Sequence, residues 1–227
     1  MKTMNVALCI PTTSNMRNWT NIGESYLKES LKPLNDNYPG LTVYLSYDDT
    51  DVLYRTQITM LSEMFENLDI HYIKQTGFEP GNVVKHWNTL SQIAFKNGFD
   101  YVYLIGDDIV YPDNNEWLPK MIGKLKDNNN IGFSAGDSGN PHLPMTQFII
   151  HKTHYDIFGY AFNPMLKNWF CDNWFCDLYP KKYINYLPDI KLLNAGGTPR
   201  YVPNDANRLH KILVKRDKHT LKKYLHL

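Results

Sequence analysis

The sequence predicts a single α/β domain, with a mostly parallel central sheet covered by helices on both faces. Short apolar runs rich in β-forming residues alternate along the chain with segments whose apolar residues recur at helical spacing. This alternation is typical of parallel sheets, because consecutive parallel strands need a long crossover connection, which is usually a helix. With 227 residues, 43% of them hydrophobic, the chain can bury a sizeable core.

The overall charge gives no reason to expect nucleic acid as a partner. The chain has 24 basic and 23 acidic residues and a formal net charge of +1. We see no run of about 18 apolar residues that would form a transmembrane segment and no signal-peptide pattern, so we expect a cytoplasmic protein. Cys9, Cys171 and Cys176 are expected to be buried free thiols, with a zinc site as the alternative.

The first expected strand, Val6–Ile10, ends in Pro11, Thr12 and Thr13. Hydroxyl side chains at a strand end can hydrogen-bond a base or a ribose, although they more often cap the helix that follows. That helix is expected over residues 18–34.

A second expected strand, Leu41–Tyr47, ends in acidic residues that begin with Asp48 and Asp49. Two interpretations are open. In one, the acids form a loop that caps a helix over residues 56–65. In the other, Asp48 or Asp49 accepts a hydrogen bond from a base or a ribose hydroxyl at the carboxyl end of the strand.

A third strand is expected over residues 70–73 and a helix over residues 82–96, whose apolar residues recur at helical spacing. Lys85 lies in the first turns of this helix. Its ammonium group faces either a diphosphate or, as is commoner for lysine, solvent.

The strand expected over residues 101–105 ends in Gly106, Asp107 and Asp108. Open α/β sheets bind ligands beyond the carboxyl ends of their strands, so this pair of carboxylates lies where a site is expected. Carboxylate oxygens suit Mg²⁺ or Mn²⁺, which hold the phosphates of nucleotides. The alternative is a solvated turn, since Gly and Asp are common turn residues.

The second half of the chain has shorter expected elements, which are a helix over residues 117–126 and strands over 131–135 and 145–150. The loop between the two strands, 136–144, is expected to recognise substrate or to act as a lid. A glycine-rich segment near the carboxyl end can bring Arg200 to a phosphate. The tail from His210 to Lys223 is expected to be a helix with solvated lysines.

An aromatic block over residues 155–179 is interrupted by Asp172. The block forms either core or a wall on which sugar rings stack. Trp169 and Trp174 are the stacking candidates, with His151 as a further acceptor-binding residue. A carboxylate among aromatic residues is either paired or has a raised pKa.

Together these motifs resemble the GT-A type of nucleotide-sugar glycosyltransferase, and most closely the small glycosyltransferases of large DNA viruses of the chlorovirus and mimivirus type. The resemblance rests on the strand end Pro11–Thr13, the acids Asp48 and Asp49, and Gly106–Asp108 in the place of the family's DxD motif. Three further segments follow in the family's order, which are 82–88, 153–159 and 168–174.

The resemblance implies transfer of a hexose or deoxyhexose from a UDP- or GDP-sugar to a hydroxyl group of a glycan or glycoprotein acceptor, with Mn²⁺ or Mg²⁺ on the diphosphate. Asp108 matches the acid that usually holds the metal, and Asp107 is the second expected ligand, while Gly106 departs from the family's motif. Asp172 matches the catalytic base of inverting members. Its rivals for this role are Asp177, His151 and His154.

The same resemblance implies a division of labour along the chain. Residues from about 1 to 110 bind the nucleotide sugar, residues from about 111 to 205 bind the acceptor, and 206–227 form a tail helix. A viral enzyme of this kind would act in the host cytoplasm. The residues expected to bind the nucleotide sugar are Pro11, Thr12, Thr13, Asp48, Asp49, Lys85, Asp107 and Arg200.

Two other functions are open. A nucleotidyltransferase uses a similar sheet and carboxylate-bound metals, but it normally has a glycine-rich phosphate loop after the first strand, which Pro11–Asn15 lacks. A non-catalytic glycan-binding module would use the aromatic wall without turnover.

Overall fold

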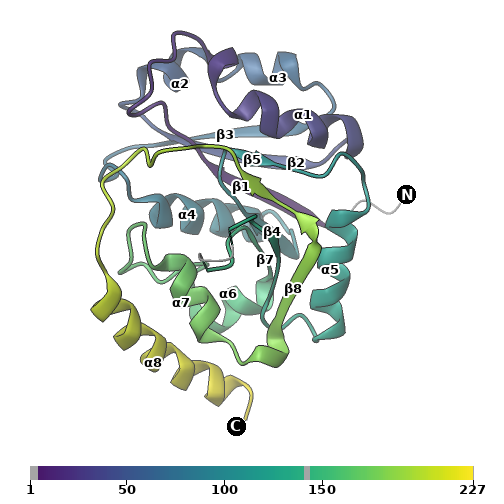
Figure 1. The fold of residues 1–227 in the computed structure, drawn as a ribbon, viewed down its shortest axis with the longest axis vertical. Helices are drawn as coiled ribbons and strands as arrows, with labels where there is room; N and C mark the ends of the chain where they lie inside the picture. Colours follow the sequence, from purple (N-terminus) through teal and green to yellow (C-terminus); the bar gives the residue numbers. More distant parts are fainter. Residues whose placement is uncertain (1–4, 141–143, 227) are drawn as a thin grey trace.

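The computed structural model describes residues 5–140 and 144–226 and confirms a single α/β domain with a mostly parallel central sheet (Figure 1). Its strands lie in the order β3-β2-β1-β4-β7-β6-β8. They are β1 (Val6–Pro11), β2 (Thr42–Asp48), β3 (Asp69–Gln75), β4 (Tyr101–Leu104), β6 (Phe133–Asp137), β7 (Phe148–His151) and β8 (Ile184–Lys191). β7 is antiparallel to both of its neighbours, and the other strands run in one direction. A small second sheet pairs β5 (Ile109–Val110) with β9 (Leu193–Asn194).

Helices cover both faces of the sheet, as predicted. Each face of the sheet has its own hydrophobic core. The helices of the first core are α1 (Leu27–Asn37), α2 (Val52–Gln57), α3 (Met60–Met64) and α5 (Trp117–Asp127). Those of the second are α4 (Val83–Lys96), α6 (Lys152–Phe158), α7 (Cys171–Leu178) and α8 (Asn207–Tyr224). Alternate residues of β1 enter the two cores, Leu8 and Ile10 on one face and Ala7 and Cys9 on the other. This burial on both faces explains why the strand is apolar throughout.

Two helices differ from the prediction. The helix expected over residues 18–34 is α1, which begins only at Leu27 and follows a short 3-10 helix, Ile22–Glu24. Upstream of α1 the backbone N–H and the hydroxyl of Thr20 both donate to the carboxylate of Glu24 (2.7 and 3.0 Å), and such local bonds compete with helix formation. The helix expected over residues 56–65 is instead the two short helices α2 and α3.

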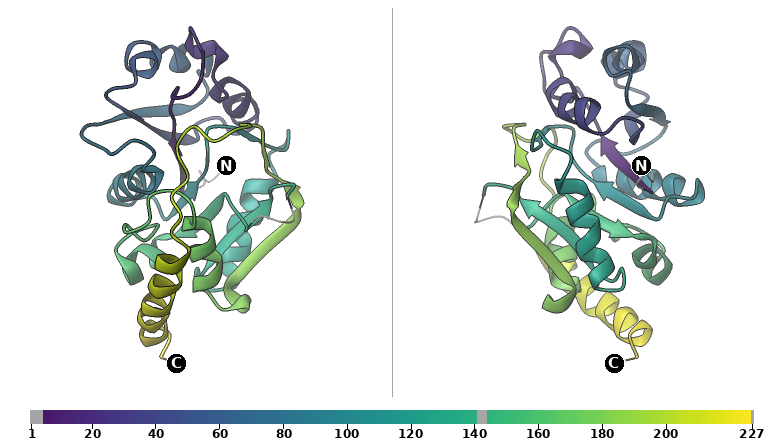
Figure 2. Two further views of the ribbon diagram at one scale, coloured as in Figure 1. Left: turned by 60° about the vertical axis from the view of Figure 1, so that its left-hand side comes forward. Right: turned by 90° about the vertical axis from the view of Figure 1, so that its right-hand side faces the viewer.

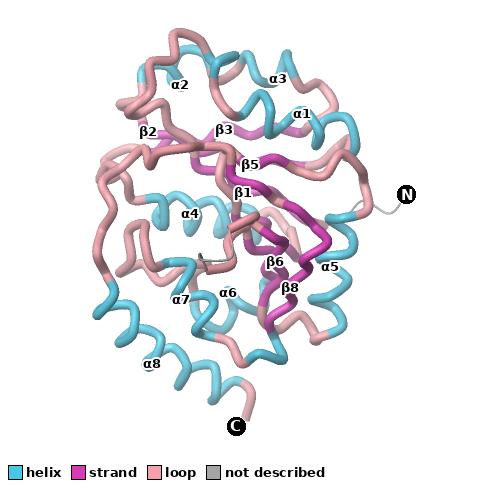
Figure 3. The backbone as a smooth tube through the Cα atoms, viewed as in Figure 1, coloured by secondary structure: helices cyan, strands magenta, loops and turns pink. Residues whose placement is uncertain are grey.

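A long connection leads from β9 to α8, and we call its residues 195–206 the strap. The strap is a loop that crosses in front of the sheet before the chain enters α8 (Figure 3). α8 projects at one end of the molecule, as the views of Figure 2 show. The loop expected over residues 136–144 includes residues 141–143, which lie outside the described residues. In the described part of the chain, none of the helices combines the length and the apolar character needed to cross a membrane.

Candidate active site

The carboxyl ends of three neighbouring parallel strands meet at one edge of the sheet. Pro11 at the end of β1 lies beside Ser46 of β2, and β4 pairs with β1 on its other side. The residues that follow these strands therefore lie close together, at the edge where open α/β sheets bind ligands. Two cavities lie there, and Arg200 and Tyr201 of the strap line both.

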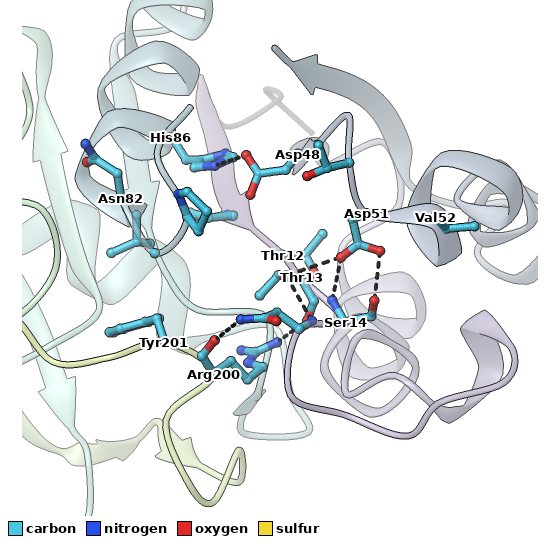
Figure 4. Close-up of a pocket in the computed structure, with 16 residues that line it drawn as sticks. Thr12, Thr13, Ser14, Asp48, Asp51, Val52, Asn82, His86, Arg200 and Tyr201 are labelled. Carbon is cyan, nitrogen blue, oxygen red and sulfur yellow. Dashed lines mark hydrogen bonds and ion pairs between the residues drawn. The ribbon is translucent and has the colours of Figure 1, made fainter. Parts of the chain in front are cut away.

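The smaller cavity, which we call the small pocket, has a volume of about 310 Å³ (Figure 4). Its wall combines the loop after β1, the loop after β2, the start of α4 and the strap. The residues predicted to bind a nucleotide sugar that line it are Pro11, Thr12, Thr13, Asp48 and Arg200. Asp49 instead lies against the end of β3, where its N–H donates to the carbonyl of Gln75 (2.9 Å).

The start of α4 presents a histidine to the small pocket in place of the expected lysine. Lys85 is exposed and its ammonium group lies 4.0 Å from the centre of the Phe78 ring, outside the pocket wall. His86 is buried against the pocket, with Nδ1 2.8 Å from the hydroxyl of Ser46 and Nε2 3.2 Å from the carboxylate of Asp48. Of the two alternatives for Lys85, the structure shows the solvated one, and His86 faces the pocket because adjacent helical residues point about 100° apart.

Asp51, which the sequence did not single out, shapes the loop after β1 (Figure 4). Its carboxylate accepts hydrogen bonds from the N–H and the hydroxyl of Ser14 (2.7 and 2.8 Å) and from the hydroxyl of Thr13 (3.2 Å). It also caps α2 through the N–H of Tyr54 (3.2 Å). Acids of this stretch therefore occupy both of the positions that the sequence left open. Asp51 caps a helix, and Asp48 faces the pocket.

The larger cavity, which we call the large cavity, has a volume of about 820 Å³. It lies between the end of β4, the segment before β7, the start of α7 and the strap. Asp108, which follows β4, and Asp172, in the first turn of α7, both line it. The structure therefore brings together the candidate metal ligand and the candidate base, which are far apart in the sequence.

Asp107 is bound by the strap through both of its carboxylate oxygens. Its side chain is 1% exposed, and Arg200 donates to both of its carboxylate oxygens, one of them at 2.6 Å. The hydroxyl of Thr12 donates to the same carboxylate at 2.6 Å. Because charge-assisted bidentate pairs are strong, this arrangement makes Asp107 the anchor of Arg200, while its role as a metal ligand stays a prediction.

Asp108 faces the large cavity, and its negative charge is less compensated by cations than that of Asp107. Its carboxylate lies 3.6 Å from the guanidinium of Arg200. Burial, followed by the negative charge of Asp107, raises the pKa of Asp108 to about 6. The strap packs directly on this side chain at Gly196, where a Cβ atom would lie 1.7 Å from a carboxylate oxygen of Asp108. Only glycine fits at that point of the strap.

The loop after β4 depends on two residues whose importance the sequence does not show. Gln147 is buried with a φ of 60°, and its side-chain carbonyl accepts the N–H of Gly106 at 3.0 Å. A Cβ atom at Gly106 would lie 2.7 Å from the carboxylate of Asp108. The absence of a side chain at Gly106 therefore leaves room for Asp108 to fold back over the loop.

Asp172 lies half-buried at the wall of the large cavity. Burial raises its pKa to about 7, and no hydrogen bond from a described residue opposes this shift. A carboxylate with such a pKa accepts a proton near neutral pH, as a general base must. Phe170, the residue just before α7, has a left-handed conformation (φ 70°) and turns the chain into the helix.

The two tryptophans of the aromatic block have different environments. Trp169 lines the large cavity and is 48% exposed, so its ring is accessible to a sugar. Trp174 is fully buried in the second core, where its indole N–H donates to Asp217 of α8 at 3.0 Å. The expected acceptor contact is therefore corrected for Trp174, whose ring is part of the core.

The histidines that were expected near the site lie away from it. His151 pairs with Tyr101 at the amino end of β4, because β7 is antiparallel, so it lies at the opposite edge of the sheet. This corrects the acceptor-binding expectation for His151. His154 is buried between Tyr179 and the carbonyl of Ala161, and burial lowers its pKa to about 4.

Few metal ligands meet at this edge of the sheet. Across residues 5–140 and 144–226, no three His, Cys, Asp or Glu side chains come together as a metal centre. Asp107 is paired, which leaves Asp108 as the predicted ligand that faces the cavity. Mg²⁺ commonly uses one or two carboxylates together with substrate phosphates and water. The residues therefore fit a metal that binds together with a diphosphate, held on the protein side by Asp108.

No family model and no curated protein matches the sequence, but solved structures share the fold. S. aureus TarS superimposes with a TM-score of 0.62 at 16% identity over 97% of this chain. The structure of TarS 1–349 in complex with UDP-GlcNAc gives a TM-score of 0.61 at 17% identity over 93% of this chain. A cytidylyltransferase from Leptospira borgpetersenii gives 0.53 at 10% identity over 82% of this chain.

The chain is shorter than these neighbours. It spans 42% of the TarS chain, 66% of the 1–349 piece and 76% of the cytidylyltransferase. At such low identities the likeness shows a shared Rossmann-like fold. Both organisms are bacteria, so the viral type expected from the sequence has no support in these neighbours.

Proposed function

We propose that the chain is a metal-dependent glycosyltransferase that moves a hexose or deoxyhexose from a nucleoside-diphosphate sugar to a hydroxyl group of a glycan or glycoprotein acceptor. The observation that carries this proposal is the pair of cavities that share Arg200. A nucleotide sugar has three parts in a row, and the site offers a polar pocket, a fixed cation and a larger cavity in the same order. TarS, which shares the fold and binds UDP-GlcNAc, supports a UDP-sugar as the donor.

The nucleoside occupies the small pocket in this proposal. Asp48, held by His86, accepts a hydrogen bond from the base or the ribose, and the loop Thr12–Ser14 closes the other side. The loop is fixed by Asp51, so its hydroxyl groups and N–H groups are already oriented before the donor binds.

The diphosphate lies beside Arg200, between the two cavities. The guanidinium is bound to Asp107 and is mostly buried, so it supplies a fixed positive charge where the leaving group gains negative charge. Mn²⁺ or Mg²⁺ would be held by Asp108 and would neutralise the same leaving group.

The sugar and the acceptor share the large cavity. Asp172 accepts the proton of the attacking hydroxyl, since it faces this cavity and its raised pKa suits a general base. Direct attack on the anomeric carbon breaks the bond to the diphosphate and inverts the configuration. Trp169 stacks on the acceptor sugar at the cavity wall.

The test is release of nucleoside diphosphate from a panel of UDP- and GDP-sugars, with Mn²⁺ or Mg²⁺ and a set of glycan acceptors. Release that needs both acceptor and metal is the expected result, and Asp172→Asn assayed in parallel reports background hydrolysis. Parallel reactions with nucleoside triphosphates and sugar phosphates measure pyrophosphate. Pyrophosphate release would assign a nucleotidyltransferase instead, and glycan binding without any release would assign a binding module.

A further inference from the structure

The terminal helix α8 separates its apolar and charged residues on opposite faces. Its buried residues are His210, Leu213, Val214, Asp217 and Leu221, and these face α6 and α7. Its exposed basic residues are Arg208, Lys211, Lys215, Arg216, Lys218, Lys222 and Lys223. We call the outward side that carries them the basic face.

The basic face concentrates charge that the rest of the chain does not have. α8 has seven of the 24 basic residues of the protein and one of its 23 acidic residues. That acid, Asp217, is buried and accepts a hydrogen bond from Arg216 at 2.8 Å. The remainder of the chain has an excess of acidic residues, so the near-zero net charge of the whole protein conceals a strongly cationic helix.

Most cations of the basic face make no ion pair within the described residues. Within the described residues, Arg216 is the member of this set that pairs with a carboxylate, and the other six make no ion pair. Lysines elsewhere in the chain do pair, as in Lys32–Asp36, Lys120–Asp189, Lys167–Glu79 and Lys191–Asp137. Lysines without an ion pair also occur elsewhere in the described residues, but on α8 six such cations lie on one exposed helix face.

Apolar side chains are exposed among these cations. Ile212 is 57% exposed in the middle of the basic face, and Tyr224, at the end of the helix, is 46% exposed. The 18 residues of α8 form a straight row about 27 Å long. A flat anionic surface with an apolar interior satisfies both the lysines and the isoleucine, whereas a nucleic-acid backbone would satisfy only the charge.

We propose that the basic face of α8 binds the surface of an anionic lipid bilayer. The helix lies along the surface, with its lysines on the headgroups and Ile212 inserted between them, while its opposite face stays packed on the domain. This inference does not depend on the proposed transfer reaction. Because α8 packs against α7, which carries Asp172 in its first turn, binding would hold the large cavity near acceptors at the membrane.

The experiment is co-sedimentation of the full chain with phosphatidylcholine vesicles, with and without about one third phosphatidylserine. The test variant replaces Lys211, Lys215, Lys218 and Lys222 by Gln. The matched control replaces four exposed lysines scattered over the domain, Lys28, Lys74, Lys96 and Lys181, by Gln and so changes the net charge equally. Circular dichroism and thermal unfolding confirm that both variants are folded.

We expect the wild type to bind anionic but not neutral vesicles, with affinity that falls as salt rises. Each lysine lost from the surface should weaken binding about fivefold, so the α8 variant should lose several hundredfold while the scattered control stays close to wild type. Ile212→Ser should weaken binding more modestly. No vesicle binding at low salt, an equal loss in the scattered control, or binding to a DNA duplex without vesicle binding would each overturn the proposal.

Discussion

The small pocket and the large cavity share Arg200 and Tyr201, but they are built from different parts of the fold. The small pocket is formed mainly by residues that directly follow parallel strands or begin α4. The large cavity shares the end of β4, but most of its wall comes from the segment before β7, the start of α7 and the strap. The ends of the strands therefore fix most of the proposed nucleotide pocket, whereas connections that can vary independently of the sheet form most of the proposed site for sugar and acceptor.

This difference predicts that substitutions in the two cavities have separable effects. Changes in the small pocket should alter donor affinity, and changes in the large cavity should alter the rate of transfer. The substitutions below test this separation.

The largest effect is expected for Asp172→Asn. Loss of the base should lower the rate of transfer roughly a hundredfold to ten-thousandfold, while the donor binds as in the wild type. Transfer is followed by release of nucleoside diphosphate, and donor binding by calorimetry. The matched control is Asp177→Asn, an exposed acid one helical turn away whose partner is His210. Equal activity of Asp172→Asn and the wild type would remove Asp172 from the role of base.

Arg200→Ala should disturb the walls of both cavities at once, because it leaves the buried carboxylate of Asp107 without its partner. We expect the free energy of unfolding to fall by about 3 kcal/mol or more, together with a loss of donor binding. Urea unfolding measures the first and calorimetry the second. Arg208→Ala, on the exposed side of α8, is the control. Unchanged stability of Arg200→Ala would show that the Asp107 pair does not hold the strap.

The pH dependence should distinguish the two cavities as well. The pKa of Asp172 is raised to about 7, and its deprotonated form is the base. Transfer at saturating donor should therefore rise about tenfold per pH unit up to pH 7 and then level off. Metal-dependent donor binding should instead weaken as the pH falls below about 6, the pKa of Asp108. The profile of kcat measures the first and calorimetry the second, and a flat kcat profile between pH 5 and pH 8 would contradict the assignment.

A smaller effect is expected for Asp48→Asn in the small pocket. Loss of a charged acceptor should weaken nucleoside-diphosphate binding roughly tenfold and leave kcat unchanged. Asp49→Asn is the matched control, because the adjacent carboxylate lies outside the pocket wall. Calorimetry with UDP and GDP measures both variants, and equal affinities for both would exclude Asp48 from the nucleotide site.

Sequence patterns predicted those parts of the site that follow from the order and direction of the strands. Thr12, Asp48 and Asp108 could be placed at one edge because each follows a strand of a parallel sheet. His151 was expected to bind the acceptor, and nothing in the sequence around it showed that β7 runs antiparallel and ends at the opposite edge of the sheet.

Contacts over long sequence separations could not be predicted. The pair of Asp107 with Arg200 joins residues 93 positions apart, and it makes Asp107 an anchor for the strap. Trp169 and Trp174 belong to the same aromatic block of the sequence, which does not distinguish them. Only the structure shows that the ring of Trp169 lies at the cavity and that of Trp174 in the core. Gln147 gives no sequence signal, because its role depends on a backbone conformation with positive φ.

Two glycines, one in the strap and one beneath it, have a consequence for the order of events in a reaction cycle. Gly196 seats the strap on Asp108, and Gly81 seats Tyr201, since a Cβ atom at Gly81 would lie 2.7 Å from the Cβ of Tyr201. Because Arg200 and Tyr201 of the strap line both cavities, a donor that spans them would contact the strap as it enters, and so would the departing nucleoside diphosphate. We expect donor to bind first and nucleoside diphosphate to leave last, with strap opening limiting turnover. Turnover should then slow as solvent viscosity rises, and insensitivity to viscosity would place the slow step in the chemistry.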